Sequence, residues 1–307
     1  MIGQNTGRAA LLACDWGTTN LRCWTLDAAG AVLADRDFEL GVSRLAPGEA
    51  QARFAQEVRP AMGAEGLPAI LCGMVGSTLG WTVAPYADAP AGLDDLRRAL
   101  VAAPGDPTAR IVPGVRGPGI TGAPDVMRGE ETQGLGWVAG APERAVGRHV
   151  ICHPGTHPKW MLIEEGKLTR FVTAMSGELF AVLTTHSVLK SDAAPDDEAA
   201  FDQGLAAAGE GDALAARLFS ARSRVVGGDA APASTPSYLS GLLIGAEVAA
   251  TPALLGVGPD EPVALLGDPR LCALYARALG RRGVDCAIFD GEAAAVAGLF
   301  ALSGMAA

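Results

Sequence analysis

A Gly-Thr pair occurs twice at the same place in a repeated order of expected strands and helices. Gly17-Thr18 follows the apolar run Ala9–Asp15, and Gly155-Thr156 follows the apolar run Arg148–Cys152. In each half, two more strands, alternating helices and strands, and a final helix come next. Domains typically hold about 100–200 residues. This duplicated order in a chain of 307 residues therefore predicts two α/β domains of like topology, at residues 1–135 and 136–307.

The change between a two-residue and a helical period separates the expected elements. In the first half we expect strands at Ala9–Asp15, Leu21–Asp27, Ala31–Leu40, Pro68–Gly73 and Arg110–Pro113, and helices at Pro47–Met62, Leu93–Val101 and Pro124–Trp137. In the second half we expect strands at Arg148–Cys152, Lys159–Glu164, Lys167–Thr173, Pro262–Gly267 and Val284–Phe289, and helices at Gly177–Lys190, Phe201–Ala221, Ser237–Ala250, Pro269–Arg282 and Glu292–Leu302. The second half therefore carries an additional helical insertion.

Composition and net charge indicate a folded protein and limit the partners that it can bind. Hydrophobic residues make up 49% and charged residues 19%, which is enough apolar material for packed cores. The net charge of −10 disfavours nucleic acid and anionic membranes as partners, because phosphate backbones need basic surfaces. A small phosphate ligand is compatible with this charge, since backbone N–H groups and a metal ion can hold it.

The localisation is predicted from features that the sequence lacks. The polar stretch Met1–Arg8 has no signal-peptide core, and no apolar run reaches the roughly 18 residues of a membrane span. The six cysteines form no C-x-x-C pair, and several lie inside apolar runs. These features predict a cytoplasmic protein with buried, reduced thiols. The oligomeric state is left open, with a homodimer as one option.

The first Gly-Thr turn has the residue types of a phosphate-binding turn. Gly17, Thr18 and Thr19 offer small side chains, N–H groups and hydroxyl donors. Asp15 ends the preceding strand, and Mg²⁺ prefers carboxylate and phosphate oxygens, so this residue is the candidate for a metal role. On spacing alone, an ordinary hairpin turn explains these residues equally well.

The second Gly-Thr turn stands at the matching place in the second half. Two such turns, with Gly155 and Thr156 in the second, are expected to hold a triphosphate from both sides. This pairing is more specific than either turn alone. His153 and His157 flank the second turn without a Cys/His cluster, so we expect no zinc site there.

The segment Pro124–Gln133 supplies candidate carboxylates. Glu130 and Glu131 stand at an expected helix start, close in sequence to Arg128. A carboxylate base is needed to deprotonate a sugar hydroxyl during phosphoryl transfer. Taken without the surrounding pattern, these acids are better explained as a first helical turn stabilised by the helix dipole.

Two segments near the C-terminus contain further glycines with a candidate role. Gly267 ends an expected strand and would let the backbone approach a flat ligand such as adenine. Gly291–Gly298 is rich in Ala and Gly, which permits close helix packing at a crossing between domains. Each signal is weak alone.

Several strings together resemble the 2-dehydro-3-deoxygalactonokinase family, over nearly the whole chain. They are DWGTTNLR (15–22), GMVGS (73–77), VPGV (112–115), PDVMRGEETQ (124–133), PGTH (154–157) with Lys159-Trp160, and Phe171–Leu189. The string at 124–133 is the most specific of them. One departure lies at the second Gly-Thr turn, where a small apolar residue and Ser are expected and this chain has His153 and Pro158.

The resemblance implies a fold and a reaction. The fold is a pair of actin-like ATPase domains, which are ribonuclease H-like, with a cleft for ATP and substrate between them. The reaction is that of a phosphotransferase with an alcohol acceptor: ATP and 2-dehydro-3-deoxy-D-galactonate give the 6-phosphate and ADP, in galactonate catabolism. The implied cofactors are ATP and Mg²⁺.

The resemblance also implies roles for individual residues. Asp15 would position Mg²⁺, Thr18 and Thr19 would contact phosphates from one side and Gly155 and Thr156 from the other, and Gly267 would line the adenosine pocket. Glu130 aligns by motif position with the catalytic Asp of glycerol-kinase-like enzymes, with Glu131 in reserve as the base. The candidates for the substrate carboxylate are Arg22, Arg44, Arg128 and Lys159, and those for the sugar pocket are Ser77, Trp81 and Tyr86.

Two other functions compete with this interpretation. One is a kinase for another sugar or sugar acid on the same fold, since the sequence does not distinguish galactonate- from gluconate-derived acids. The other is a non-catalytic actin-like sensor of nucleotide or sugar. A regulator of that kind usually carries a basic DNA-binding segment, and the chain shows none.

Overall fold

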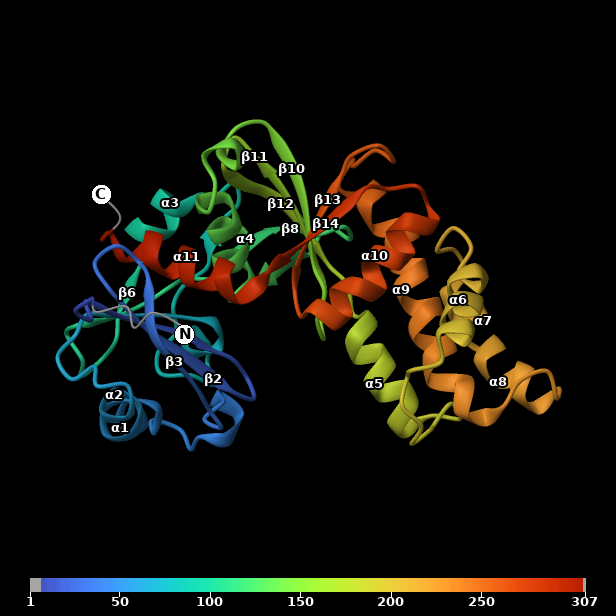
Figure 1. The fold of residues 1–307 in the computed structure, drawn as a ribbon, viewed down its shortest axis with the longest axis horizontal. Helices are drawn as coiled ribbons and strands as arrows, with labels where there is room; N and C mark the ends of the chain where they lie inside the picture. Colours follow the sequence, from blue (N-terminus) through green and yellow to red (C-terminus); the bar gives the residue numbers. More distant parts are fainter. Residues whose placement is uncertain (1–6, 306–307) are drawn as a thin grey trace. The chain divides into compact units, whose positions relative to one another are not determined.

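Two mixed sheets, whose first five strands follow the same order, organise the chain (Figure 1). In this computed structural model, which describes residues 7–305, one sheet has the order β3-β2-β1-β4-β7-β6 and the other the order β12-β11-β10-β13-β14. In each sheet the first strand is central. Its hairpin partner lies on one side and a parallel strand on the other, because β4 pairs parallel with β1 and β13 with β10.

The elements group into two compact units. Unit 1 contains the described residues up to Arg148, the segment Ile163–Arg170, and the described residues from Gly291 onward; unit 2 contains His149–Leu162 and Phe171–Asp290. The sequence-based division at residues 135 and 136 differs from this grouping. It falls inside helix α4, Glu130–Ala139, and it assigns the last helix to the second half, whereas that helix groups with unit 1.

Unit 1 is built on the six-stranded sheet and a small three-stranded sheet of order β5-β8-β9. Its strands are β1 Leu11–Trp16, β2 Leu21–Leu26, β3 Val32–Phe38, β4 Ala69–Cys72, β5 Ala87–Asp88, β6 Val101–Ala102, β7 Ala109–Ile111, β8 Val115–Pro118 and β9 Pro124–Met127. Its helices are α1 Ala50–Arg53, a π-helical segment Phe54–Val58, α2 Arg59–Ala61, α3 Leu93–Arg98, α4 Glu130–Ala139 and α11 Gly291–Ser303, with 3-10 turns at Val42–Arg44, Gly73–Gly76 and Pro142–Ala145.

Unit 2 is built on the five-stranded sheet, with a helical insertion before its fourth strand. Its strands are β10 Arg148–His153, β11 Lys159–Glu164, β12 Lys167–Thr173, β13 Val263–Gly267 and β14 Cys286–Asp290; the tip of the β11–β12 hairpin counts with unit 1. Its helices are α5 Ser176–His186, α6 Glu198–Ala207, α7 Leu214–Leu218, α8 Ser220–Val226, α9 Thr235–Leu254 and α10 Pro269–Arg281, with a 3-10 turn at Pro232–Ser234.

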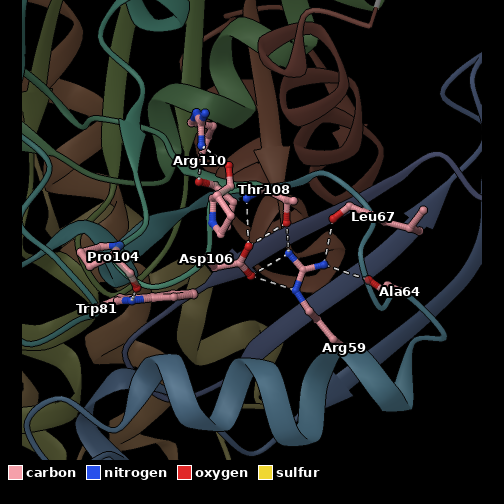
Figure 2. A network of polar contacts seen from close by, with 10 residues as sticks. Arg59, Ala64, Leu67, Trp81, Pro104, Asp106, Thr108 and Arg110 are labelled. Carbon is pink, nitrogen blue, oxygen red and sulfur yellow. Dashed lines mark hydrogen bonds and ion pairs between the residues drawn. The ribbon is translucent and has the colours of Figure 1, made fainter.

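A buried arginine anchors the edge of the unit 1 core (Figure 2). Arg59 donates to the Asp106 carboxylate from Nε at 3.0 Å and from Nη2 at 2.8 Å, and its Nη2 also donates to Thr108 Oγ1. Its Nη1 donates to two backbone carbonyls, those of Ala64 and Leu67. An arginine has five N–H groups. All five are therefore satisfied here, as a buried guanidinium requires.

Two glycines bring α4 and α11 into backbone contact within unit 1 (Figure 1). A Cβ atom on Gly298 of α11 would lie 2.2 Å from the Thr132 carbonyl oxygen, and one on Gly136 of α4 would lie 1.9 Å from the Ala294 carbonyl oxygen. No side chain fits at either position. The close packing expected for the Ala/Gly-rich helix is therefore present, but its partner is α4 of the same unit, so the crossing is not between the two units as expected.

The expectation of a helix over Pro124–Trp137 is wrong for its first residues. Pro124–Met127 forms β9, which pairs antiparallel with β8 through Val115↔Met127 and the following positions. The helix begins only after Gly129, whose φ of 113° lies in a region that side-chain-bearing residues rarely adopt. The strand forms because it pairs in a hairpin with the preceding strand β8, and the periodicity of the segment taken alone does not report this pairing.

One helix bears on the expectation that no segment spans a membrane. Among the described residues, Pro232–Leu254 is long and apolar enough to cross a membrane by length and composition, but 67% of its window is buried inside the fold. Of the stretch Met1–Arg8, only Gly7 and Arg8 lie among the described residues. The six cysteines are free; five are buried and Cys286 is half-buried.

Replacing Gly298 with Ala should destabilise the protein. The new methyl group meets a backbone carbonyl, so α4 and α11 must separate. Overpacking of this kind costs about 1–3 kcal/mol. Urea or thermal denaturation measures the change. Gly280→Ala is the matched control, because a Cβ there meets nothing within 4 Å and Ala favours a helix by up to about 1 kcal/mol over Gly. Equal effects of the two substitutions would contradict the packing argument.

Candidate active site

The turn between β1 and β2 presents exposed hydroxyl groups on a fixed backbone. Gly17 N–H donates to the Asn20 carbonyl at 2.9 Å, and the side chains of Thr18 and Thr19 are exposed. The Thr18 carbonyl accepts from both the backbone N–H and the hydroxyl of Ser43, so the underside of the turn is held by the next 3-10 turn. Outward hydroxyl groups on a rigid turn suit an anionic ligand.

Asp15 lies in β1 just before this turn, and its carboxylate is surrounded by polar side chains. Its carboxylate is hydrogen-bonded to the side chains of Cys72 and Gln133. Burial, followed by the nearby charge of Glu130, raises the pKa of Asp15 to about 6. A Cβ on Gly73 would lie 3.0 Å from Asp15 Oδ1, so a glycine is needed there for close approach. Asp15, Glu130 and Gln133 are therefore brought together.

The two adjacent glutamates of α4 have different surroundings. Glu131 is only 1% exposed, and its carboxylate accepts from the Gly129 N–H at 2.7 Å and from Thr132 Oγ1 at 3.0 Å. Burial and the charge of Glu130 raise the pKa of Glu131 to about 8. Glu130 is half-buried and accepts from the Arg128 N–H at 3.2 Å. The Glu131 carboxylate thus accepts hydrogen bonds from groups at the start of α4, and the Glu130 carboxylate is the more accessible of the two.

The four basic side chains expected to bind the substrate carboxylate have different surroundings. Arg22 forms two hydrogen bonds to Asp37 and one to Glu292, and Arg44 forms an ion pair with Glu39 at 3.1 Å. The remaining two lie in different units. Lys159 is 4% exposed in unit 2 and donates to the His157 carbonyl under the second turn, whereas Arg128 lies in unit 1 directly before Gly129.

The residues expected in the sugar pocket are not equivalent either. The Trp81 ring lies 5.3 Å from the Phe54 ring, centroid to centroid. Its Nε1 donates to the Pro104 carbonyl, a contact that Figure 2 shows. Ser77 donates to the Met74 carbonyl at 2.7 Å. Tyr86 is 39% exposed, and its ring faces the Arg128 guanidinium at 4.4 Å. Of the three, Tyr86 alone contacts another candidate side chain through its own ring.

The second Gly-Thr turn abuts the start of α5 in unit 2. Glu178 N–H donates to the Thr156 carbonyl at 2.9 Å, and a Cβ on Gly177 would lie 2.3 Å from the Gly155 carbonyl oxygen. His157 pairs with the Glu178 carboxylate on the exposed side of the turn. Gly267, with φ of 142°, lies next to the turn, where its Cβ would be 3.6 Å from the Pro154 carbonyl oxygen.

A cavity of about 300 Å³ adjoins this turn within unit 2. Its lining is mainly apolar with a few polar groups, which is typical of sites for small molecules. The lining residues are Gly155, Thr156, Ser176, Gly177, Phe180, Pro195, Ser240, Leu243, Ile244, Leu271, Leu274 and Tyr275. Gly155 and Thr156 connect it to the turn, whereas Gly267 is not among its lining residues.

Sequence reasoning missed most of this cavity, and it assigned no role to Gln133, the last residue of the segment Pro124–Gln133. The cavity walls come from α5, α9 and α10, whose apolar residues are indistinguishable from core residues in the sequence. Gln133, which hydrogen-bonds to Asp15, did carry a signal. It follows Glu130 by three positions in a helix, so both side chains lie on one side of α4.

The donor set around Asp15 fits a magnesium ion that also binds phosphate. Mg²⁺ is usually held by one or two carboxylates, substrate phosphates and water, and not by a protein cage. The described part of the chain has no cluster of three or more His, Cys, Asp or Glu suited to a metal. Burial and, after it, the charge of Glu130 raise the pKa of Asp15, and a cation beside the two carboxylates would relieve the repulsion between them.

The two sheets and their Gly-Thr turns define the class of protein. A central first strand, a hairpin on one side and parallel strands on the other, occurring twice in one chain, is the duplicated actin-like ATPase fold. The (R)-2-hydroxyglutaryl-CoA dehydratase component A of Acidaminococcus fermentans shares the fold with a TM-score of 0.52 at 15% identity, over 98% of this chain and 100% of that chain.

Sequence comparison then identifies the family. The family model for 2-keto-3-deoxy-galactonokinase matches residues 15–302, and the chain belongs to this family. The 2-dehydro-3-deoxygalactonokinase of Escherichia coli (strain K12) is 36% identical over 296 residues, covering 95% of this chain and 96% of the relative. A relative from Rhizobium meliloti (strain 1021), named "Probable 2-dehydro-3-deoxygalactonokinase", is 37% identical over 296 residues, with 94% and 95% covered.

A solved structure agrees with this assignment. A protein from Sinorhizobium meliloti with the provisional name of a 2-dehydro-3-deoxygalactonokinase matches with a TM-score of 0.83 at 35% identity. The match covers 95% of this chain and 97% of that chain. The duplicated actin-like fold that the sequence predicts is therefore confirmed.

Glu131 should make stability depend on pH in an unusual direction. Its pKa is about 8 when folded and 4.5 in the absence of the fold, so between these values the folded state keeps a proton that the unfolded state has lost. The free energy of unfolding should therefore fall as pH rises from 6 to 8, by up to about 1.4 kcal/mol per pH unit. Urea denaturation at several pH values measures this. Glu131→Gln should flatten the slope, and an unchanged slope would show that Glu131 is ionised in the fold.

Proposed function

We propose that the protein is an ATP-dependent kinase that phosphorylates 2-dehydro-3-deoxy-D-galactonate to its 6-phosphate in galactonate catabolism. The observation that carries this conclusion is the family match over residues 15–302, together with 36% identity to the Escherichia coli enzyme across 95% of the chain. The polar residues of unit 1 and the cavity of unit 2 have the chemistry that such a reaction needs.

In unit 2, the cavity beside the second turn is our candidate for the adenosine moiety. Its apolar lining from α9 and α10 suits a flat base, and Ser176 and Ser240 offer hydroxyl groups. Gly155 and Thr156 border the cavity and are assigned to nucleotide phosphate, with the N-terminus of α5 directly behind them. Gly267 lies beside this turn, near the Pro154 carbonyl.

In unit 1, the residues around Asp15 are assigned to the transferred phosphate. The hydroxyl groups of Thr18 and Thr19 are exposed beside Gly17 and are available to phosphate oxygens. Asp15 is assigned to Mg²⁺, which would neutralise charge on the phosphates when bound. Gln133 and Cys72 orient the Asp15 carboxylate by hydrogen bonds.

Glu130 is our candidate for the general base. It accepts the proton of the 6-hydroxyl group as that oxygen forms a bond to the γ-phosphorus, while the bond from this phosphorus to the leaving ADP oxygen breaks. Glu131 is unsuited to this task, because its carboxylate is buried and already accepts two hydrogen bonds.

The cellular setting of this activity is part of the proposal. The buried free thiols fit a cytoplasmic protein, and the acidic surface fits an enzyme that acts on small molecules rather than on nucleic acid or membranes. A homodimer stays an option that the sequence left open.

Glu130→Gln should lower kcat by about 10²–10⁴-fold while changing the KM for ATP little. The amide keeps the size of the side chain but cannot accept the proton. A coupled ADP-release assay with saturating sugar acid measures both constants. Glu131→Gln is the matched control and should lose less than about tenfold, since an amide oxygen can still accept the Gly129 N–H. The reverse ranking of the two variants would move the base to Glu131.

Turnover with single sugar acids tests the function as a whole. We expect ATP-dependent phosphorylation of 2-dehydro-3-deoxy-D-galactonate with a kcat/KM at least about tenfold above that for the gluconate epimer, because one displaced hydroxyl group leaves a polar partner unsatisfied. Mass spectrometry of the product checks that the 6-phosphate forms. If neither acid is phosphorylated while an unrelated sugar is, the family-based assignment is wrong for this chain.

A further inference from the structure

Arg128 has two buried guanidinium nitrogens without a hydrogen-bond partner among the described residues. Its Nη2 donates to the Ala84 carbonyl at 2.8 Å, and the Tyr86 ring covers one face of the group at 4.4 Å. Its Nε and Nη1 are buried and have no partner. The contrast is Arg59, whose five N–H groups are all bonded (Figure 2). Unsatisfied buried donors are costly, so a native structure that keeps them needs a reason.

The position of Arg128 connects it to the candidate catalytic carboxylates. It lies directly before Gly129 and the first turn of α4, and its backbone N–H donates to Glu130. Its Nη1 lies 2.8 Å from where a Cβ on Gly76 would be. Gly76 ends the 3-10 turn whose first residue, Gly73, packs against Asp15. One turn of chain therefore separates the guanidinium from the Asp15 carboxylate.

The other basic candidates already have partners or other tasks. Arg22 is bound by Asp37 and Glu292, and Arg44 is bound by Glu39. A carboxylate ligand would have to displace these acids. Arg128 has no such acid in the interactions described for it. Its Nη2 carries a second N–H besides the one bonded to Ala84, so Nη2 together with either unpartnered nitrogen can match the two oxygens of a carboxylate.

We propose that Arg128 is the specificity-determining residue that binds the carboxylate of the sugar acid; this inference rests on the proposed kinase function. The two unpartnered nitrogens have no exposed surface in this conformation. The segment 77–86, which supplies the Ala84 carbonyl and the Tyr86 ring, must move aside for the ligand. Tyr86 and Val83 of this segment are exposed, at 39% and 56%, so the ligand displaces side chains that already face solvent.

The test combines the substitution Arg128→Met with removal of the charge on the substrate, so that four combinations of enzyme and substrate are compared. kcat/KM is measured for 2-dehydro-3-deoxygalactonate and for its neutral C1 carboxamide, with wild type and variant. We expect Arg128→Met to lower kcat/KM for the acid by about 100-fold or more and for the amide by less than about threefold, because the amide has no charge to lose. Arg128→Lys should recover part of the loss, since it restores charge without the planar fork.

Two control variants separate this role from a structural one. Arg116→Met removes an exposed arginine of the neighbouring β8, which already pairs with Asp88, and should leave both substrates unaffected. Arg59→Met should lower the melting temperature clearly, whereas Arg128→Met should change it little, because it removes one hydrogen bond and two unsatisfied nitrogens. Equal losses for acid and amide, or no loss for either, would overturn the inference. A wild-type enzyme inactive on every sugar acid would instead reject the proposed function.

Discussion

Backbone contact between α4 and α11 determines where the polar residues of unit 1 can lie. Gly136 and Gly298 allow the helices to meet without intervening side chains, which fixes the axis of α4. Glu131 and Thr132 are buried, at 1% and 0% exposure, which fixes its rotation. Successive residues turn by about 100°. Glu130 and Gln133 are therefore left on the side that faces Asp15, and the electrostatics of the carboxylates follow from helix packing.

Much of the fold could be predicted from the sequence because its signals are local. The β11–β12 hairpin has the expected bounds, and both Gly-Thr turns join the expected strands, since apolar runs and small turn residues act over a few positions. The segment Pro124–Met127 could not be assigned in this way. Its partner β8 comes directly before it in the chain, and the two short strands have no clear alternation of apolar and polar residues, so this hairpin was masked by the weak helical pattern.

The candidate site was predictable in residue type but not in geometry. Adjacent Glu130 and Glu131 look alike in the sequence, and only the buried hydrogen bonds of Glu131 distinguish them. Likewise, whether an arginine is already paired depends on acids far along the chain, such as Glu292 for Arg22. The cavity of unit 2 draws on α5, α9 and α10, so its apolar lining has no contiguous signature.

The order of the chain has a consequence for biosynthesis. Unit 1 begins the described chain, yet its α4 packs against α11, which is synthesised after all of unit 2. Domains generally fold in order of emergence from the ribosome. Here the groove that receives α11 stays uncovered while unit 2 is being translated. The nascent protein therefore exposes apolar surface of α4 while the residues between Ala139 and Gly291 are synthesised, and this interval is when it would depend most on chaperones.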